Sequence, residues 1–192
     1  PVIDNLRALD LPHLAVPHGS IADVYQAITL IGNRCDRPQT ARRLINLIRS
    51  DIDALKMSAR ALNIVPKRLL VVLGSMPVPP KATFVAGPAS FLDNLVEMAG
   101  HTNIAHEVLK DAYGEIPLEN LRILDPEVIL EFRDQPDTKQ MDQLYGSWSE
   151  VGMLQAIQHR RVRSIGGPQW LSAGPRIAVE LHRFITVLSE FR

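Results

Sequence analysis

The sequence has no excess of charge of either sign, because its 192 residues include 21 Lys and Arg and 21 Asp and Glu. Nucleic-acid-binding domains carry a clustered basic excess, so this balance argues against a nucleic-acid partner, although residues 160–163 form a local basic cluster. Cys35 is the only cysteine, which excludes an internal disulfide and a cysteine-based metal cluster. No apolar run approaches the roughly 18 residues of a membrane-spanning helix.

Familiar catalytic and phosphate-binding motifs are also missing. The chain has no Gly-x-Ser-x-Gly turn, no Gly-x-x-x-x-Gly-Lys loop and no Gly-x-Gly-x-x-Gly turn after a strand. His101 and His106 are five residues apart, whereas metal-binding histidines on one helix face are usually four apart. We therefore predict no metal site, no cofactor and no catalytic activity. A cytoplasmic α/β enzyme acting on a small molecule stays the alternative. The scattered remaining histidines are expected at the surface or in the core: His13, His18, His159 and His182.

The first 40 residues resemble the end of an α/β domain. Residues 3–9 predict a short helix, and residues 14–16 predict a short apolar strand. Ser20 followed by Asp23 is a capping box, in which each side chain accepts a backbone N–H of the first helical turn. The helix that it opens is predicted to end at Gly32.

A long helix is then followed by alternating strands and helices. Residues 40–62 carry apolar side chains at helical spacing without Gly or Pro, which predicts an unbroken helix of roughly 33 Å. The patterns beyond it predict strands at 69–73, 83–86, 128–132 and 162–165, and helices at 90–98, 119–124, 140–156 and 175–191. This alternation indicates an α/β layered fold, whose ligands collect at the carboxyl ends of the strands.

Two polar helix starts each have two interpretations. Ser90 and Asp93 repeat the capping pattern, and the N–H groups of such a helix start can hold an anionic ligand group. An ordinary helix cap explains the same residues. Glu119 opens a short helix, where the helix dipole favours a carboxylate and gives a sufficient structural reason for it.

Aromatic residues make up only 5% of the chain, and four of the larger rings fall in or beside predicted loops: Tyr113, Tyr145, Trp148 and Trp170. Such rings suit a pocket for a large flat ligand, because they give much contact area with little loss of entropy. Trp148 and Tyr145 are equally explained as plugs at the edge of the core. Tyr113 is expected in a Gly-flanked loop, which favours a functional role.

Four segments, in this order, resemble segments of one protein family. They are residues 84–93 (FVAGPASFLD), 116–130 (IPLE, then LDPEVIL), 156–162 (AIQHRRV) and 174–176 (GPR). Together they are similar to the C-terminal lobe of the bacterial solute-binding proteins that deliver cobalamin, iron-siderophores or haem to ABC importers. The resemblance covers most of residues 68–191 and extends more weakly over the two preceding helices.

This resemblance implies two α/β lobes joined by one long helix, with the ligand held between them. On that pattern, residues 1–39 are the end of the N-terminal lobe, residues 40–66 are the interlobe helix and linker, and residues 67–192 are a complete Rossmann-like C-terminal lobe. The first half of the N-terminal lobe has no counterpart in the sequence, so we interpret the chain as a processed or truncated product.

The resemblance also implies a function and its residues. The protein would capture a metal chelate (cobalamin, a ferric siderophore or haem) and present it to an ABC permease, in the periplasm or lipid-anchored outside the cytoplasmic membrane. Glu119 occupies the family's permease-docking position. The ligand-binding residues are expected to be Tyr113, Trp170, Ser90, Phe91 and Arg133. A free-standing fragment with a structural or interaction role is a further alternative.

Overall fold

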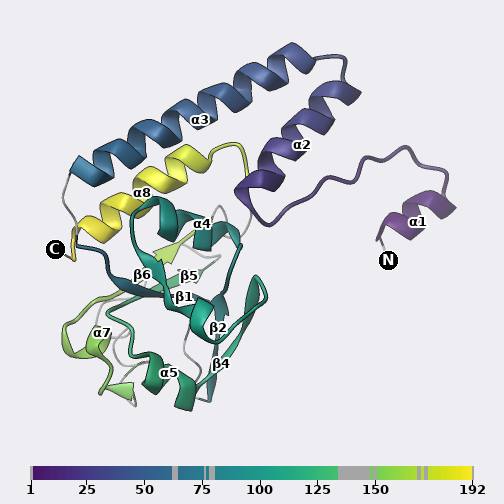
Figure 1. Cartoon of the computed structure of the whole chain (residues 1–192). Helices are drawn as coiled ribbons and strands as arrows, with labels where there is room; N and C mark the ends of the chain where they lie inside the picture. The colour runs from purple at the N-terminus through teal and green to yellow at the C-terminus, as the bar shows by residue number, and fades with distance from the viewer. Residues whose placement is uncertain are drawn as a thin grey trace.

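The computed structural model describes residues 2–61, 65–75, 77, 81–133, 148, 151–167, 170 and 173–191. The chain begins with α1 (Val2–Ala8), continues as an extended segment and forms a hairpin of α2 (Ile21–Arg34) and α3 (Pro38–Ala61) before it enters the sheet (Figure 1). α1 has no buried residue. Among the helices described, none has the length and apolar character needed to span a membrane.

The short strand predicted at residues 14–16 is wrong. Residues 11–18 have no regular structure, and Leu14 and Val16 are both exposed. Three apolar residues in a row fit the strand pattern, but a strand also needs neighbours that pair with its backbone. The sheet in the described residues pairs no strand with this segment.

α2 begins where the sequence predicts and ends later. Ser20 Oγ accepts the Asp23 N–H at 3.2 Å, and Asp23 Oδ2 accepts the Ser20 N–H at 3.0 Å, so both halves of the capping box are present. Gly32 is not the C-terminal cap, because the helix continues to Arg34. A Cβ at Gly32 would overlap the Cβ of Ala41 on α3, so this glycine allows the two helices to approach closely.

The long helix is confirmed. α3 runs unbroken for 24 residues, which corresponds to roughly 36 Å. Ile48, Ile52 and Ala59 are buried in the core that α3 shares with α8 (Ile177–Ser189). Leu47 and Met57 remain exposed.

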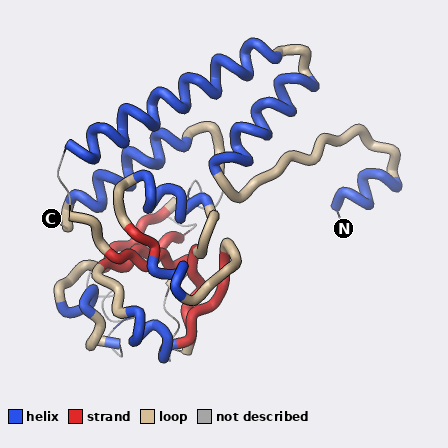
Figure 2. Tube along the Cα trace, viewed as in Figure 1, coloured by secondary structure: helices blue, strands red, loops and turns tan. Residues whose placement is uncertain are grey.

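A six-stranded mixed sheet forms the centre of the described fold (Figure 2). Its strands are β1 (Arg68–Leu73), β2 (Ala82–Ala86), β3 (Thr102–Asn103), β4 (Tyr113–Pro117), β5 (Val128–Arg133) and β6 (Val162–Gly166). The order is β4-β2-β1-β5-β6, and β3 pairs with the first residues of β1. β1, β5 and β6 are parallel, whereas β2 and β4 are antiparallel to their neighbours. The α/β class is confirmed, but the sequence analysis missed β3 and β4, and Tyr113 opens β4 instead of lying in a loop.

Helices cover both faces of the sheet and create two apolar cores (Figure 1). One core joins α3, α4 (Phe91–Met98) and α8 to one sheet face. The other joins the 3-10 helix η1 (Ile104–Glu107), α5 (Leu118–Leu124) and α7 (Gln155–Gln158) to the opposite face. Most of the helix predicted at 140–156 lies outside the described residues, as does Tyr145.

Gly32→Ala is expected to destabilise the protein by about 1–2 kcal/mol, because the added methyl group would overlap a side chain fixed to the α3 backbone. Inside an unobstructed helix the same change stabilises by about 1 kcal/mol, so the sign of the effect is informative. Thermal and urea unfolding measure it. Gly174→Ala is the matched control, since nothing lies within 4 Å of a Cβ built there. A more stable Gly32→Ala variant would disprove the close approach.

Candidate ligand-binding pocket

A pocket of about 630 Å³ opens at the carboxyl end of β1. This volume is within the range of small-molecule sites, and the carboxyl edge of the parallel strands is where α/β sheets bind ligands. The walls come from β1, β2, β4, the start of α4 and the segments before α2 and α8. The lining residues are His18, Gly19, Leu73, Phe84, Leu92, Ala112, Tyr113, Trp170 and Ala173.

Two aromatic rings on neighbouring strands form one wall. Tyr113 is paired with Ala86, two residues after Phe84, so Phe84 and Tyr113 are diagonal neighbours on one face of the sheet. Their ring centroids are 6.4 Å apart and the planes are inclined by 19°. Phe84 and Tyr113 are exposed by 45% and 39%, so this wall offers two nearly parallel ring faces to a ligand.

The hydroxyl of Tyr113 is partly desolvated. Desolvation by burial raises the pKa of Tyr113, and a hydrogen bond with the Phe91 backbone opposes the shift only in part. The group is therefore a neutral phenol near neutral pH. This contact also brings Phe91, through its backbone, to the edge of the site.

A close backbone contact brings Tyr113 to the pocket. The Gly87 N–H donates to the Ala112 carbonyl at 2.8 Å, and a Cβ at Gly87 would overlap the Asp111 carbonyl oxygen. Only a residue without a side chain lets these two segments pack together. Gly87 thus positions the residue immediately before Tyr113.

Trp170 is tied to the core behind the pocket. It is only 3% exposed, and its ring centroid lies 5.2 Å from that of Phe132. Phe132 in turn stacks on Phe184 of α8, with 6.2 Å between centroids. This chain of aromatic contacts fixes the ring, so Trp170 is a rigid part of the pocket lining.

Ser90 and Phe91 are buried in this chain. Ser90 Oγ accepts the Asp93 N–H at 3.1 Å and donates to the Gly87 carbonyl at 2.9 Å, so its hydroxyl caps α4. The Phe91 side chain belongs to the core under α3 and α8. Their predicted contact with a ligand stays a prediction.

Arg133 lies on the opposite face of the sheet from Tyr113 and Trp170. It forms an ion pair with the fully buried Glu131, which also accepts the Trp148 Nε1–H at 2.8 Å. Side chains alternate between the two faces along β5, which separates Arg133 from Phe132 and the aromatic pocket. Trp148 is completely buried, in agreement with its interpretation as a core residue.

Glu119 is exposed in the first turn of α5. Within the described residues no ion pair joins it to a basic side chain. The pocket and Glu119 lie at opposite ends of β4, since Tyr113 begins this strand and α5 follows its last residue.

A family model described as periplasmic binding protein matches residues 3–168. The chain belongs to the periplasmic binding protein family. No curated protein matches the sequence.

Solved structures of low sequence identity share the fold of this periplasmic binding protein. A possible iron-binding (periplasmic solute-binding) protein from Staphylococcus epidermidis ATCC 12228 is 17% identical, with a TM-score of 0.78 over 97% of this chain and 70% of that one. The periplasmic heme-binding protein RhuT from Roseiflexus sp. RS-1 is 20% identical, with a TM-score of 0.76 over 98% and 70%. An ABC-type Fe3+-hydroxamate transport system from Saccharomonospora viridis DSM 43017 is 18% identical, with a TM-score of 0.72 over 96% and 64%.

Two residues of the binding protein's pocket, Phe84 and His18, have side chains suited to ligand contact but were not selected as ligand-binding residues from the sequence. Phe84 appeared as part of a strand and as the first residue of the segment 84–93, although its alternation with Thr83 and Val85 places it on the face opposite to Val85. His18 appeared only as a scattered histidine. Its closeness to the pocket depends on how the segment before α2 lies against β1 and β4, which no local sequence signal reveals.

Behind the pocket, a buried carboxylate holds α4 in place. Asp93 Oδ1 accepts hydrogen bonds from Asn103 Nδ2 at 2.9 Å and His106 Nε2 at 2.7 Å, and Asp93 Oδ2 accepts the Ala89 N–H at 2.9 Å. The Glu97 carboxylate lies close by. One side-chain oxygen or nitrogen from each of Asp93, Glu97 and His106 lies within 4.8 Å of the other two. Both oxygens of Asp93 are engaged in hydrogen bonds, so the geometry is that of a structural network.

Asp93→Ala is expected to destabilise the protein by about 2–4 kcal/mol, because it leaves three donors around a buried site without an acceptor. His106→Ala removes a half-exposed partner and should lose less than about 1 kcal/mol. Asp23→Ala, at the less buried capping box of α2, is the matched control with a loss of about 1 kcal/mol. Urea unfolding of the three variants tests this order, and equal losses would contradict it.

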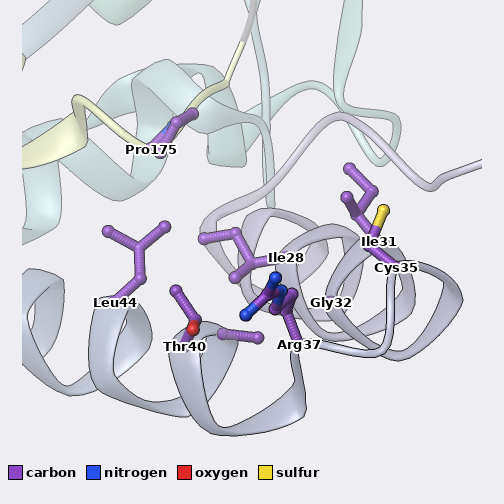
Figure 3. A pocket seen from close by; sticks show the side chains of 9 residues that line it. Ile28, Ile31, Gly32, Cys35, Arg37, Thr40, Leu44 and Pro175 are labelled. Carbon is purple, nitrogen blue, oxygen red and sulfur yellow. The ribbon is translucent and has the colours of Figure 1, made fainter.

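A second pocket, of about 340 Å³, lies between α2 and α3 (Figure 3). Leu44 and Ile28 from the two helices and Pro175 from the segment before α8 surround it. Its lining includes no aromatic ring and no histidine. The pocket beside Tyr113 is therefore the better candidate for a flat or metal-containing ligand.

Proposed function

We propose that this periplasmic binding protein captures a metal chelate (cobalamin, a ferric siderophore or haem) in the pocket beside Tyr113 and presents it to the permease of an ABC importer. The observation that carries the proposal is the set of aromatic walls formed by Phe84, Tyr113 and Trp170 at the carboxyl edge of the sheet. The cycle contains no catalytic step. It takes place in the periplasm, or at the outer side of the cytoplasmic membrane through a lipid anchor.

The character of the pocket supports a chelate as the ligand. Among the nine lining residues that the structure describes, His18 alone is ionisable in the acidic to neutral range, and three are aromatic. Apolar and aromatic surfaces bind large flat ligands by burying their faces. Structural neighbours are described as heme-binding and Fe3+-hydroxamate proteins, which favours this class over the alternative of a cytoplasmic enzyme.

We assign α3 as the helix between two lobes, within residues 40–66, and residues 67–192 as the C-terminal lobe. Residues 1–39 are assigned to the end of an N-terminal lobe. The chain spans 70% of the Staphylococcus epidermidis protein. The pocket is bounded mainly by elements of residues 67–192, with only His18 and Gly19 from the preceding part.

The 192-residue chain is expected to bind hemin or a ferric hydroxamate weakly, with a Kd of about 10 μM or higher, because an open pocket buries too little of a ligand to offset the losses of association. Phe84→Ala and Tyr113→Ala should each weaken this binding by about 2- to 10-fold. Ile123→Ala removes an apolar side chain that is even more exposed, on α5, and is the control without effect. Calorimetry and absorbance titration measure the affinities. Submicromolar binding, or aromatic variants equal to wild type, would contradict this model.

Glu119 is proposed to dock on an arginine of the permease. Its carboxylate is exposed and has no basic partner in the described residues, so it is available for an intermolecular pair. We place it on the cleft-side rim of the lobe. Charges at such a rim mainly set specificity and association rate. The alternative role is stabilisation of the start of α5, worth about 0.3–1 kcal/mol.

Glu119→Ala in the gene of the host organism should impair uptake of the ligand while its affinity for the binding protein is nearly unchanged. Glu119→Arg should impair uptake more strongly, because it faces a like charge across the interface, and the loss should depend on ionic strength. Asp51→Ala changes an exposed acid on α3 and is the control. Uptake of radiolabelled chelate gives the readout. Wild-type uptake with a slightly lower Tm would leave Glu119 only its role in the helix start.

A further inference from the structure

His18 lines the aromatic pocket and belongs to the irregular segment just before α2 begins at Ile21. Two sets of hydrogen bonds hold this segment. The capping box between Ser20 and Asp23 fixes the start of α2, and the Ile21 N–H donates to Asn94 Oδ1 on α4 at 3.2 Å. Because α4 also supplies Leu92 to the pocket, this hydrogen bond connects the segment that carries His18 to one wall of the pocket.

Among the described residues that line the pocket, two have side chains that commonly bind metals, His18 and Tyr113. The Tyr113 hydroxyl is engaged with the Phe91 backbone, and burial raises the pKa of this group. Coordination by Tyr113 would compete with this hydrogen bond.

The His18 imidazole has no such restraint. Its side chain is exposed, and in the part of the chain that the structure describes no hydrogen bond or ion pair involves it. His13, five residues earlier, differs because its Nδ1 lies 3.0 Å from the Leu11 carbonyl oxygen, and it does not line the pocket. His18 is thus the available nitrogen donor at the site.

We propose that His18 coordinates the metal of the bound chelate and that the pocket therefore selects a flat macrocyclic chelate with an open axial position over a hexadentate siderophore. This inference rests on the proposed function. One imidazole nitrogen donates its lone pair to the metal and replaces an axial water, with no change of oxidation state. A hexadentate ferric siderophore has no position left for imidazole, so His18 adds nothing to its binding.

The rest of the pocket agrees with this division of roles. Phe84 and Tyr113 present nearly parallel rings that match the face of a macrocycle. None of the described lining residues is Lys, Arg, Asp or Glu, so this part of the pocket offers no charged partner to charged substituents of the ligand. The aromatic wall therefore selects a flat ligand, and His18 selects a metal with an open axial position.

The test compares hemin, metal-free protoporphyrin IX and a hexadentate ferric trihydroxamate on the 192-residue chain. His18→Ala should abolish the imidazole-type shift of the hemin Soret band and weaken hemin binding by at least about tenfold. The same variant should leave the affinities for metal-free protoporphyrin and the trihydroxamate unchanged. Added free imidazole should restore the hemin spectrum of His18→Gly, and His13→Ala is the matched control.

The possible failures are distinguishable. An unchanged hemin spectrum in His18→Ala, or loss of the coordinated spectrum in Tyr113→Phe instead, would overturn the role of His18. Tighter binding of the trihydroxamate than of hemin by the wild type would overturn the selectivity. If the wild type binds none of the three probes at millimolar concentration, the proposed function itself fails.

Discussion

The burial of β1 on both of its faces is the constraint on which the rest of the structure depends. Leu69 and Val71 belong to the core under α3, α4 and α8, while Leu70 and Val72 belong to the core above α5 and α7, and all four are completely buried. A strand without a polar face requires helices on both sides of its sheet. These layers close the faces and leave the ends of the strands as the places where a ligand can reach the sheet. The pocket beside Leu73, the last residue of β1, follows from this arrangement.

The sequence predicted the elements whose signals are local. The Ser20 capping box, the breaker-free helix α3 and the apolar strands β1 and β5 are each specified within a few turns or residues. β4 was missed because in this strand only Ile116 is fully buried, so its apolar pattern is weak. Its existence depends on pairing with β2, about 30 residues away. The strand wrongly predicted at 14–16 is the converse case. Its local apolar pattern is present, but no strand in the described residues pairs with it.

The residues of the candidate site were likewise predictable only where the signal was local. Tyr113 and Trp170 were selected as amphipathic rings, and they do line one pocket. Phe84 joins them only through the β2–β4 register, which sequence spacing does not reveal. Arg133 was predicted to contact the ligand. The structure pairs it with Glu131 on the sheet face opposite to the aromatic pocket, and its contact with a ligand stays a prediction. Predicting which strand ends meet was thus easier than predicting which side chains face each other.

The antiparallel pair of strands β2 and β4 gives the two proposed recognition events a common support. Tyr113 begins β4 and Pro117 ends it, which separates the ligand-facing ring from the start of α5 by about 13 Å along the strand. In the described residues β4 pairs only with β2, and its exposed Glu115 and Pro117 are residues that discourage further strand pairing at such an edge. Because the register of one strand sets both positions, a slip by one residue would turn Tyr113 away from the pocket and displace Glu119 together with it. The proposed ligand contact and the proposed docking site therefore depend on the same five residues of backbone pairing, although no side chain is shared between them.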